Sequence, residues 1–216
     1  MTPIAEATIF VTLRRRMVDA QLRERGILDE RVLDATARVP RHEFVPERYR
    51  DEAYEDHPLP IGEGQTISQP YIVALMLEAL SLTPTDRVLE VGTGSGYVTA
   101  LLAELAAQVV TVERHAALAE DAGNLLARLG YGNVKVVVGD GSQGYPPSAP
   151  YDAIIVSAAA QVVPRALLAQ LADGGRLIIP VGTFDEQQLQ LIRMSSGQPR
   201  TQLRELCRFV PLVTDP

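Results

Sequence analysis

The chain has 216 residues, of which 46% are hydrophobic and 22% charged, and its formal net charge is −7. This length can bury a full core, and the acidic balance argues against binding to a nucleic-acid backbone. The single cysteine, Cys207, excludes an intramolecular disulfide framework, and no run approaches the roughly 20 apolar residues of a membrane span. We therefore expect a cytoplasmic monomer with no nucleic-acid, membrane or metal partner.

The first part of the chain predicts helices followed by a long loop. Apolar residues at helical spacing predict a helix over residues 8–25, which Gly26 ends, and a second helix over residues 29–39. Residues 40–70 contain five prolines and two glycines, a composition typical of a loop that carries function rather than packing. A further helix is predicted from Pro70 to about Leu80.

From residue 84 onward, short apolar runs alternate with helical segments. Strands are predicted at 87–91, 108–113, 134–138, 151–157 and 175–181, and helices at 97–107, 115–129 and 163–172. This alternation is typical of a parallel sheet covered by helices on both faces. The runs 188–194 and 203–213 flank a polar turn, which predicts an antiparallel hairpin at one edge of the sheet.

Three alternating glycines, Gly92, Gly94 and Gly96, follow the first predicted strand of that sheet. A strand, a glycine turn and a helix let a cofactor lie against bare backbone at the positive end of the helix. A dinucleotide fingerprint would place its last glycine where Tyr97 stands, so a pyrophosphate cofactor is disfavoured. Glu113 ends the next strand, where an acid can accept both hydroxyls of a ribose. The pattern favours a nucleoside cofactor, with S-adenosylmethionine as the first candidate.

The other strand ends supply further candidate ligands, because ligands of open α/β sheets bind beyond the carboxyl ends of the strands. Glu90 precedes the glycine turn, and Asp140 lies between Gly139 and Gly141, where it can approach an adenine amino group. Ser157 opens a run of small residues that leaves room for a ligand. Any one of these residues could instead cap a helix or make a turn. Candidate ligands at the ends of four strands together favour a nucleoside site.

Several segments resemble the protein-L-isoaspartate O-methyltransferase family, over about residues 20–213. The resembling segments are residues 38–41, 44–45, 59–70, 88–97, 139–141, 151–156, 174–182 and 208–212. The resemblance implies an α/β fold with a seven-stranded, Rossmann-like class I methyltransferase sheet, mostly parallel with a C-terminal antiparallel hairpin. It also implies a single domain, in which residues 1–83 form an N-terminal helical and substrate-loop segment, 84–182 the cofactor-binding core and 183–216 the hairpin strands.

By position, the resemblance implies that Ser68 is the catalytic residue. The cofactor-binding residues are expected to be Glu90, Gly92, Thr93, Gly94, Ser95, Gly96, Glu113, Arg114, Asp140 and Gly141. The substrate-binding residues are expected to be Ile61, Gly62, Gln65, Thr66, Ile67, Ser157, Ala158, Val210, Pro211 and Leu212. The implied reaction esterifies the free carboxyl of L-isoaspartyl residues in damaged proteins and peptides with S-adenosyl-L-methionine. It yields S-adenosyl-L-homocysteine and initiates repair through a succinimide.

Alternatives stay open at this point. A related methyltransferase could act on a normal aspartate of a dedicated peptide, or on a small-molecule acid, with the same cofactor site. A module that binds S-adenosylmethionine without turnover is disfavoured by the intact run at residues 66–68, and Tyr97 disfavours a dinucleotide-dependent oxidoreductase. Since a carboxylate nucleophile is already ionised at neutral pH, the implied reaction needs no general base.

Overall fold

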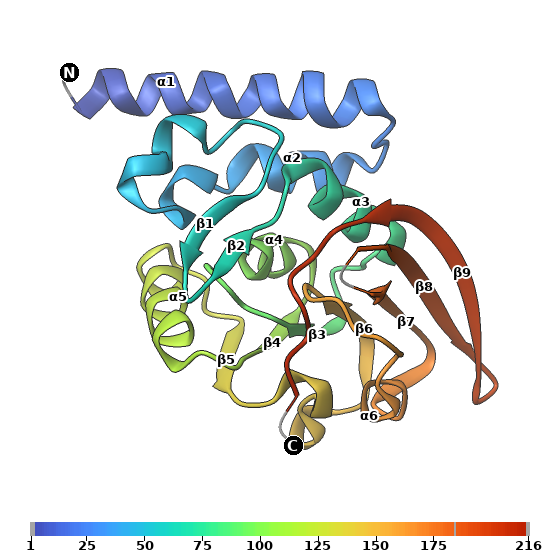
Figure 1. Ribbon diagram of the computed structural model, residues 1–216. Helices are drawn as coiled ribbons and strands as arrows, with labels where there is room; N and C mark the ends of the chain where they lie inside the picture. The colour runs from blue at the N-terminus through green and yellow to red at the C-terminus, as the bar shows by residue number, and fades with distance from the viewer. Residues whose placement is uncertain (1–2, 184, 215–216) are drawn as a thin grey trace.

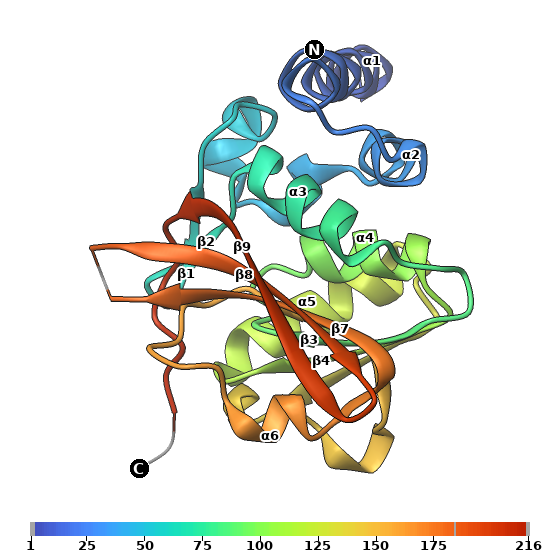
Figure 2. The same cartoon turned by 90° about the vertical axis from the view of Figure 1, so that its right-hand side faces the viewer.

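The N-terminal part of the chain folds into short helices and a β-hairpin. The computed structural model describes residues 3–183 and 185–214. In chain order this part contains α1 (Pro3–Arg16), the π-helix η1 (Met17–Leu22), η2 (Arg23–Arg25), α2 (Glu30–Arg38), η3 (Arg41–Phe44), η4 (Glu47–Glu52), β1 (Leu59–Gly62) and β2 (Gln65–Ile67). Figures 1 and 2 show α1 and α2 on one side of the molecule, with α1 farthest from the sheet.

The remaining elements alternate between strand and helix, as predicted. They are α3 (Pro70–Leu80), β3 (Arg87–Val91), α4 (Tyr97–Leu105), β4 (Gln108–Glu113), α5 (Ala116–Arg128), β5 (Val134–Val138), η5 (Gly141–Gln143), η6 (Pro146–Ser148), β6 (Tyr151–Val156), α6 (Arg165–Leu168), β7 (Leu171–Gly182), β8 (Gln187–Ser195) and β9 (Gln198–Cys207). In the described part of the chain, no helix is long and apolar enough to cross a membrane.

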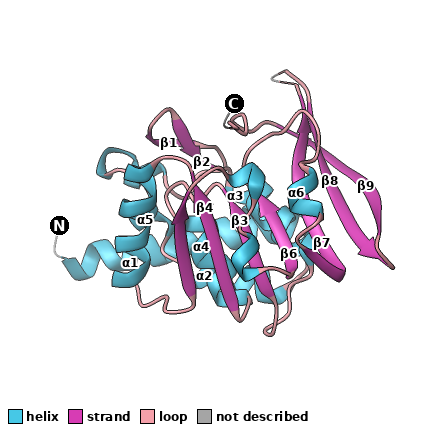
Figure 3. Ribbon diagram, turned by 90° about the horizontal axis from the view of Figure 1, so that it is seen from below, coloured by secondary structure: helices cyan, strands magenta, loops and turns pink. Residues whose placement is uncertain are grey.

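One mixed sheet forms the centre of the fold. Among residues 3–183 and 185–214, seven strands lie in it in the order β5-β4-β3-β6-β7-β8-β9. The strands from β5 to β7 are parallel, whereas β8 and β9 run antiparallel to their neighbours (Figure 3). This confirms the predicted sheet with an antiparallel hairpin at one edge. The strand order reverses between β3 and β6, which opens a crevice at their carboxyl ends.

Side chains of the central strands alternate between two apolar layers, because successive residues of a strand point to opposite faces. Val88 packs in the layer that contains α3 and α4, and Leu89 and Val91 pack in the layer that contains α6. Figure 2 shows α3 and α4 on one side of the sheet and α6 on the other. Burial on both faces explains why these strands read as nearly continuous apolar runs.

Four predicted segments differ from the structure, and the first three lie before the C-terminal hairpin. The helix expected over 163–172 is only the four residues of α6, because Leu171 already pairs with Tyr151 at the start of a bulged β7. The loop expected over 40–70 contains the β1–β2 hairpin, whose end residues Leu59 and Ile67 are buried. The helix expected over 8–25 begins at Pro3, and its last turns are the irregular η1 and η2.

The segment after β9 leaves the sheet instead of continuing the predicted strand 203–213. The buried amide of Gln187 accepts a hydrogen bond from Phe209 N (2.6 Å) and donates one to Phe209 O (3.1 Å). The chain then crosses the end of β6, where Pro211 pairs with Ala159. β9 is one of the two edge strands of the sheet, with β5 at the other edge, and its exposed residues include Pro199, Arg200 and Glu205.

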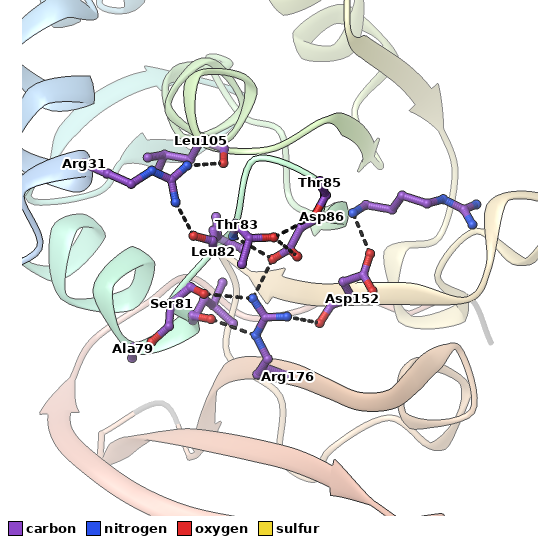
Figure 4. A network of polar contacts seen from close by, with 12 residues as sticks. Arg31, Ala79, Ser81, Leu82, Thr83, Thr85, Asp86, Leu105, Asp152 and Arg176 are labelled. Atoms are coloured by element: carbon purple, nitrogen blue, oxygen red, sulfur yellow. Dashed lines mark hydrogen bonds and ion pairs between the residues drawn. The ribbon is translucent and has the colours of Figure 1, made fainter.

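A polar network joins several elements at the amino ends of the parallel strands (Figure 4). The guanidinium of Arg176 on β7 donates to Leu80 O (2.8 Å), Ser81 O (3.1 Å) and Asp152 O (2.9 Å), and to Asp86 Oδ2 (2.5 Å). Burial opposes ionisation of Asp86, but hydrogen bonds from Thr83 and Arg176 outweigh it and lower the pKa of this carboxyl. One side chain thus joins the end of α3, the turn before β3 and the start of β6.

We predict that Arg176→Lys lowers the free energy of unfolding by about 2–3 kcal/mol. A lysine cannot bond all these carbonyls at once, and each lost hydrogen bond is worth about 1 kcal/mol. Urea unfolding followed by circular dichroism measures the loss. Arg193→Lys is the control, because Arg193 is exposed and donates to Ala79 O at only 3.5 Å. Equal stability of the Arg176 variant and the wild type would contradict the role of this network.

Candidate active site

A cavity lies at the carboxyl ends of β3, β4 and β6. It contains about 780 Å³ of empty space, its open mouth included, and is lined by the glycine turn, the end of β4, the β1–β2 hairpin and the segment 210–213. Its lining combines apolar side chains with a few polar groups, as in sites that hold small molecules and cofactors. The cavity is therefore in the place that the reversal of strand order predicts for a ligand.

The glycine turn between β3 and α4 requires its glycines. Gly92, Gly94 and Gly96 have φ values of 92°, 54° and 88°, in the left-handed region that other residues rarely adopt. The turn is also crowded, since a Cβ on Gly94 would lie 3.2 Å from Ile61 Cδ1 of the hairpin. Gly96 is the N-cap of α4, so the partial positive charge of the helix start lies beside the cavity.

Glu113 connects the end of β4 to the glycine turn. One oxygen, Oε2, accepts from Gly94 N at 2.9 Å, and the other, Oε1, accepts from His115 N at 2.9 Å. Glu113 also lines the cavity. Because each carboxylate oxygen has two lone pairs, acceptor capacity remains on both oxygens. This arrangement can accept the two adjacent hydroxyls of a ribose.

Glu90, expected to bind the cofactor, is fully buried and does not line the cavity. The pleat of β3 turns its side chain toward α4, where Thr99 Oγ1 donates to Glu90 Oε2 at 2.5 Å. Burial raises the pKa of Glu90 to about 8, against the opposing hydrogen bonds of Thr99 and Thr111, so its carboxyl is protonated at neutral pH. Thr111 also bonds Thr93 of the glycine turn, with 2.6 Å between the two Oγ1 atoms. Glu90 thus belongs to a buried polar cluster beneath the turn.

The hairpin and the C-terminal segment form the opposite walls of the cavity. Ser68 follows β2 directly and lines the cavity, and its carbonyl oxygen accepts from Arg41 Nη2 at 2.8 Å. Across the cavity, Val210 O accepts from Ala159 N (2.8 Å) and Leu212 N donates to Ala159 O (2.8 Å). The backbone therefore holds both walls in place.

The hairpin also contacts the cofactor side of the cavity at its tip. Glu63 has a φ of 50°, and its Oε2 lies 3.6 Å from His115 Nδ1. Together with the packing of Ile61 on Gly94, this contact makes the hairpin a cover over the glycine turn. Ile61 therefore touches the turn without lining the cavity.

The structure brings most of the expected site residues together. Those that line the cavity are Ser68, Gly92, Thr93, Gly94, Ser95, Glu113, Arg114, Gly141, Gln65, Thr66, Ile67, Ser157, Ala158, Val210, Pro211 and Leu212. Those that do not line it are Glu90, Gly96, Asp140, Ile61 and Gly62. Asp140 instead caps η5, where its Oδ1 accepts from Ser142 N at 2.9 Å.

Lining residues that the sequence analysis did not assign to the site are Val91, Tyr97, Val98, Val112, His115 and Val213. Most are apolar ends of elements, which cannot be told from core residues in a sequence. The position of His115, two residues after the expected ligand Glu113, could have indicated that it lies at the cavity. The switch point, the glycine turn and the acid that ends β4 together define a class I methyltransferase.

A family model described as protein-L-isoaspartate(D-aspartate) O-methyltransferase matches residues 13–216, and the chain belongs to this family. A protein-L-isoaspartate O-methyltransferase of Koribacter versatilis is 56% identical over 99% of this chain and 96% of that protein. One from Roseiflexus sp. is 58% identical over 94% of this chain and 93% of that protein.

Solved structures agree with this assignment. The enzyme of this type from Plasmodium falciparum, solved with S-adenosyl-L-homocysteine, has a TM-score of 0.82 at 28% identity, covering 94% of this chain and 99% of that chain. Another solved protein-L-isoaspartate O-methyltransferase has a TM-score of 0.81 at 33% identity, covering 91% of this chain and 65% of that chain. The family resemblance and the expected fold class are confirmed.

We predict that Glu90→Gln stabilises the protein increasingly as the pH rises from about 5 to about 8. A glutamate in an unfolded chain has a pKa of about 4.3, so in this window unfolding releases a proton that folded Glu90 retains. Wild-type stability therefore falls with rising pH, by up to about 1.4 kcal/mol per pH unit from this group, and the neutral glutamine removes that loss.

Urea unfolding at about pH 5.5 and about pH 7.5 measures the difference. Glu120→Gln, on the exposed face of α5, serves as the control and should change stability alike at both pH values. A Glu90→Gln effect that is the same at both pH values would show that Glu90 is ionised in the folded protein.

Proposed function

We propose that this protein transfers the methyl group of S-adenosylmethionine to the free carboxyl of L-isoaspartyl residues in damaged proteins and peptides. Membership of the family supports this function. The observation that carries it is that Ser68 and the glycine turn line the same cavity, so that an acceptor and a donor can meet there. The single cysteine and the acidic net charge support a cytoplasmic protein without nucleic-acid partners. We further propose that it acts as a single-domain monomer without membrane partners.

The residues of the cofactor side fit S-adenosylmethionine, which supplies an electrophilic methyl group when bound. The glycine turn presents the backbone of Gly92 and Gly94 to the cavity, and Glu113 can accept from the ribose hydroxyls. Gly141 lines the cavity, and we assign the neighbouring Asp140 to the adenine amino group. The carboxylate of Glu113 also suits a ligand that carries positive charge.

Ser68 is the group that we assign to the acceptor. An isoaspartyl carboxyl has a pKa near 4 in model compounds, so the nucleophile is ionised at neutral pH and no base has to remove a proton. The Ser68 hydroxyl can donate a hydrogen bond to one carboxylate oxygen, which directs the other oxygen toward the methyl group. Arg41 holds the backbone of Ser68 at its carbonyl oxygen.

The remaining contribution is positioning in a site from which water is excluded. Ile67, Val210 and Leu212 place apolar surface around the acceptor side. Holding two reactants in line can supply up to about 7–11 kcal/mol in favourable systems. The ester carbonyl can lose methanol, whereas a carboxylate has no comparable leaving group. The neighbouring backbone nitrogen can therefore attack the ester and close a succinimide, and addition of water to the ring returns some normal aspartate.

The substrate class is tested with a peptide that contains one isoaspartyl residue and its twin with a normal aspartyl residue. We expect methyl esterification of the first and a rate at least about tenfold lower on the second, because carboxylate position decides attack. Transfer of labelled methyl groups measures both rates. Equal rates would favour the dedicated-peptide or small-acid alternatives, and no transfer to either peptide would overturn the proposed function.

For Ser68→Ala we predict a turnover about 100-fold lower, because one donor aimed at the reacting carboxylate is lost. The Kd for S-adenosylhomocysteine should stay unchanged, since the glycine turn and Glu113 are intact. Ser68→Thr, which keeps a hydroxyl, should retain more activity than the alanine variant. Wild-type turnover in Ser68→Ala would remove Ser68 from the mechanism.

A further inference from the structure

Arg41 is a completely buried arginine next to the active site. It begins η3 and has an exposure of 0%. Its Nε donates to Ala53 O at 2.7 Å, and its Nη2 donates to Ser68 O at 2.8 Å. The guanidinium also lies over the ring of Tyr97, with 4.7 Å between Arg41 Cζ and the ring centroid. The same group therefore contacts three segments that are far apart in the sequence.

Burial of this charge is costly, and stability alone does not account for it. Burial lowers the pKa of Arg41, because a desolvated cation is disfavoured. No carboxylate within the described residues forms a salt bridge with the guanidinium. Two carbonyl oxygens and one ring face offset only part of the desolvation. An apolar side chain could fill this volume at a lower cost, but it could not bond two carbonyls at once.

Two of the residues that Arg41 contacts, Ser68 and Tyr97, lie on different sides of the active site. Ser68 lies on the acceptor side, and Tyr97 begins α4 directly after Gly96, on the cofactor side. Tyr97 is itself fixed, because it is 1% exposed and packs edge-on against Phe44 with 5.7 Å between ring centroids. Arg41 thus connects the serine to the start of the helix that follows the glycine turn.

We propose that Arg41 is a positioning residue for methyl transfer, which holds Ser68 against Tyr97 and so sets the distance between the acceptor carboxylate and the donor methyl group. The proposal rests on the proposed function. Misplacement of reacting groups by about 1 Å can reduce a rate about 100-fold, so a small relaxation of this contact is sufficient to impair turnover. The cofactor keeps its own contacts at the glycine turn and Glu113, and its affinity does not depend on Arg41.

Arg41→Lys tests the proposal, because lysine keeps the charge but cannot donate to both carbonyls while lying flat on the ring. We expect kcat on an isoaspartyl peptide to fall between about 10-fold and 100-fold, with the Kd for S-adenosylhomocysteine changed less than about threefold. Amide hydrogen exchange should become faster over residues 65–69 and stay unchanged over residues 92–96. Arg41→Gln, which removes the buried charge and keeps one donor, is measured in the same way in case the lysine variant does not fold.

Arg176→Lys is the matched control, because Arg176 is also shielded from solvent and also donates to carbonyl oxygens, but at the other end of the sheet. Its kcat should stay within about twofold of the wild type at a temperature where circular dichroism shows both variants folded. A folded Arg41 variant with wild-type kcat would overturn the proposal, and so would an equal loss in Arg176→Lys. A wild-type protein without turnover on the peptide would instead overturn the proposed function itself.

Discussion

The register between β3 and β4 is the constraint on which the geometry of the site depends. These strands pair in parallel with Glu90 opposite Thr111 and Val91 opposite Val112. In this register the glycine turn after β3 meets the end of β4, so that Glu113 reaches Gly94 N. A slip by one residue would exchange the faces of every side chain in the shifted strand. It would bring Glu113 out of the cavity and break up the buried polar cluster beneath the turn.

Two guanidinium groups, that of the fully buried Arg41 and that of the largely buried Arg176, extend this constraint to the rest of the molecule. Arg176 ties the turn before β3 and the start of β6 at one end of the sheet, and Arg41 joins the hairpin and η4 to α4 at the other. Both bond mainly to backbone carbonyls, which fixes chain positions rather than side-chain orientations. Such contacts add to the packing of Leu59 and Ile67 in holding the β1–β2 hairpin. Through these contacts, the surrounding segments are fixed relative to the parallel strands of the sheet.

The strands and the cofactor side could be predicted from local sequence, but the acceptor side could not. Apolar runs between turn residues gave the bounds of β3 and β4, because burial on both faces leaves a continuous signal. The bounds of the less buried edge strand β5 followed from its run of valines. The β1–β2 hairpin was missed since Pro60 interrupts its short alternation. The burial of Arg41 depends on Ala53, Ser68 and Tyr97, so no local pattern reveals it. The pleat of β3 decides whether the Glu90 side chain faces the cavity or the core. The position of an acid near a strand end does not reveal which face it lies on.

The edge strand β9 has a consequence for a protein whose substrates are damaged polypeptides. Such chains expose unpaired backbone, and an open sheet edge invites them to add as another strand. β9 begins with Gln198 and Pro199, and its residues Arg200 and Glu205 are exposed to solvent. Proline withholds a backbone donor, and fixed charges are costly to bury between paired strands. These two features disfavour the addition of a misfolded chain as a further strand beside β9.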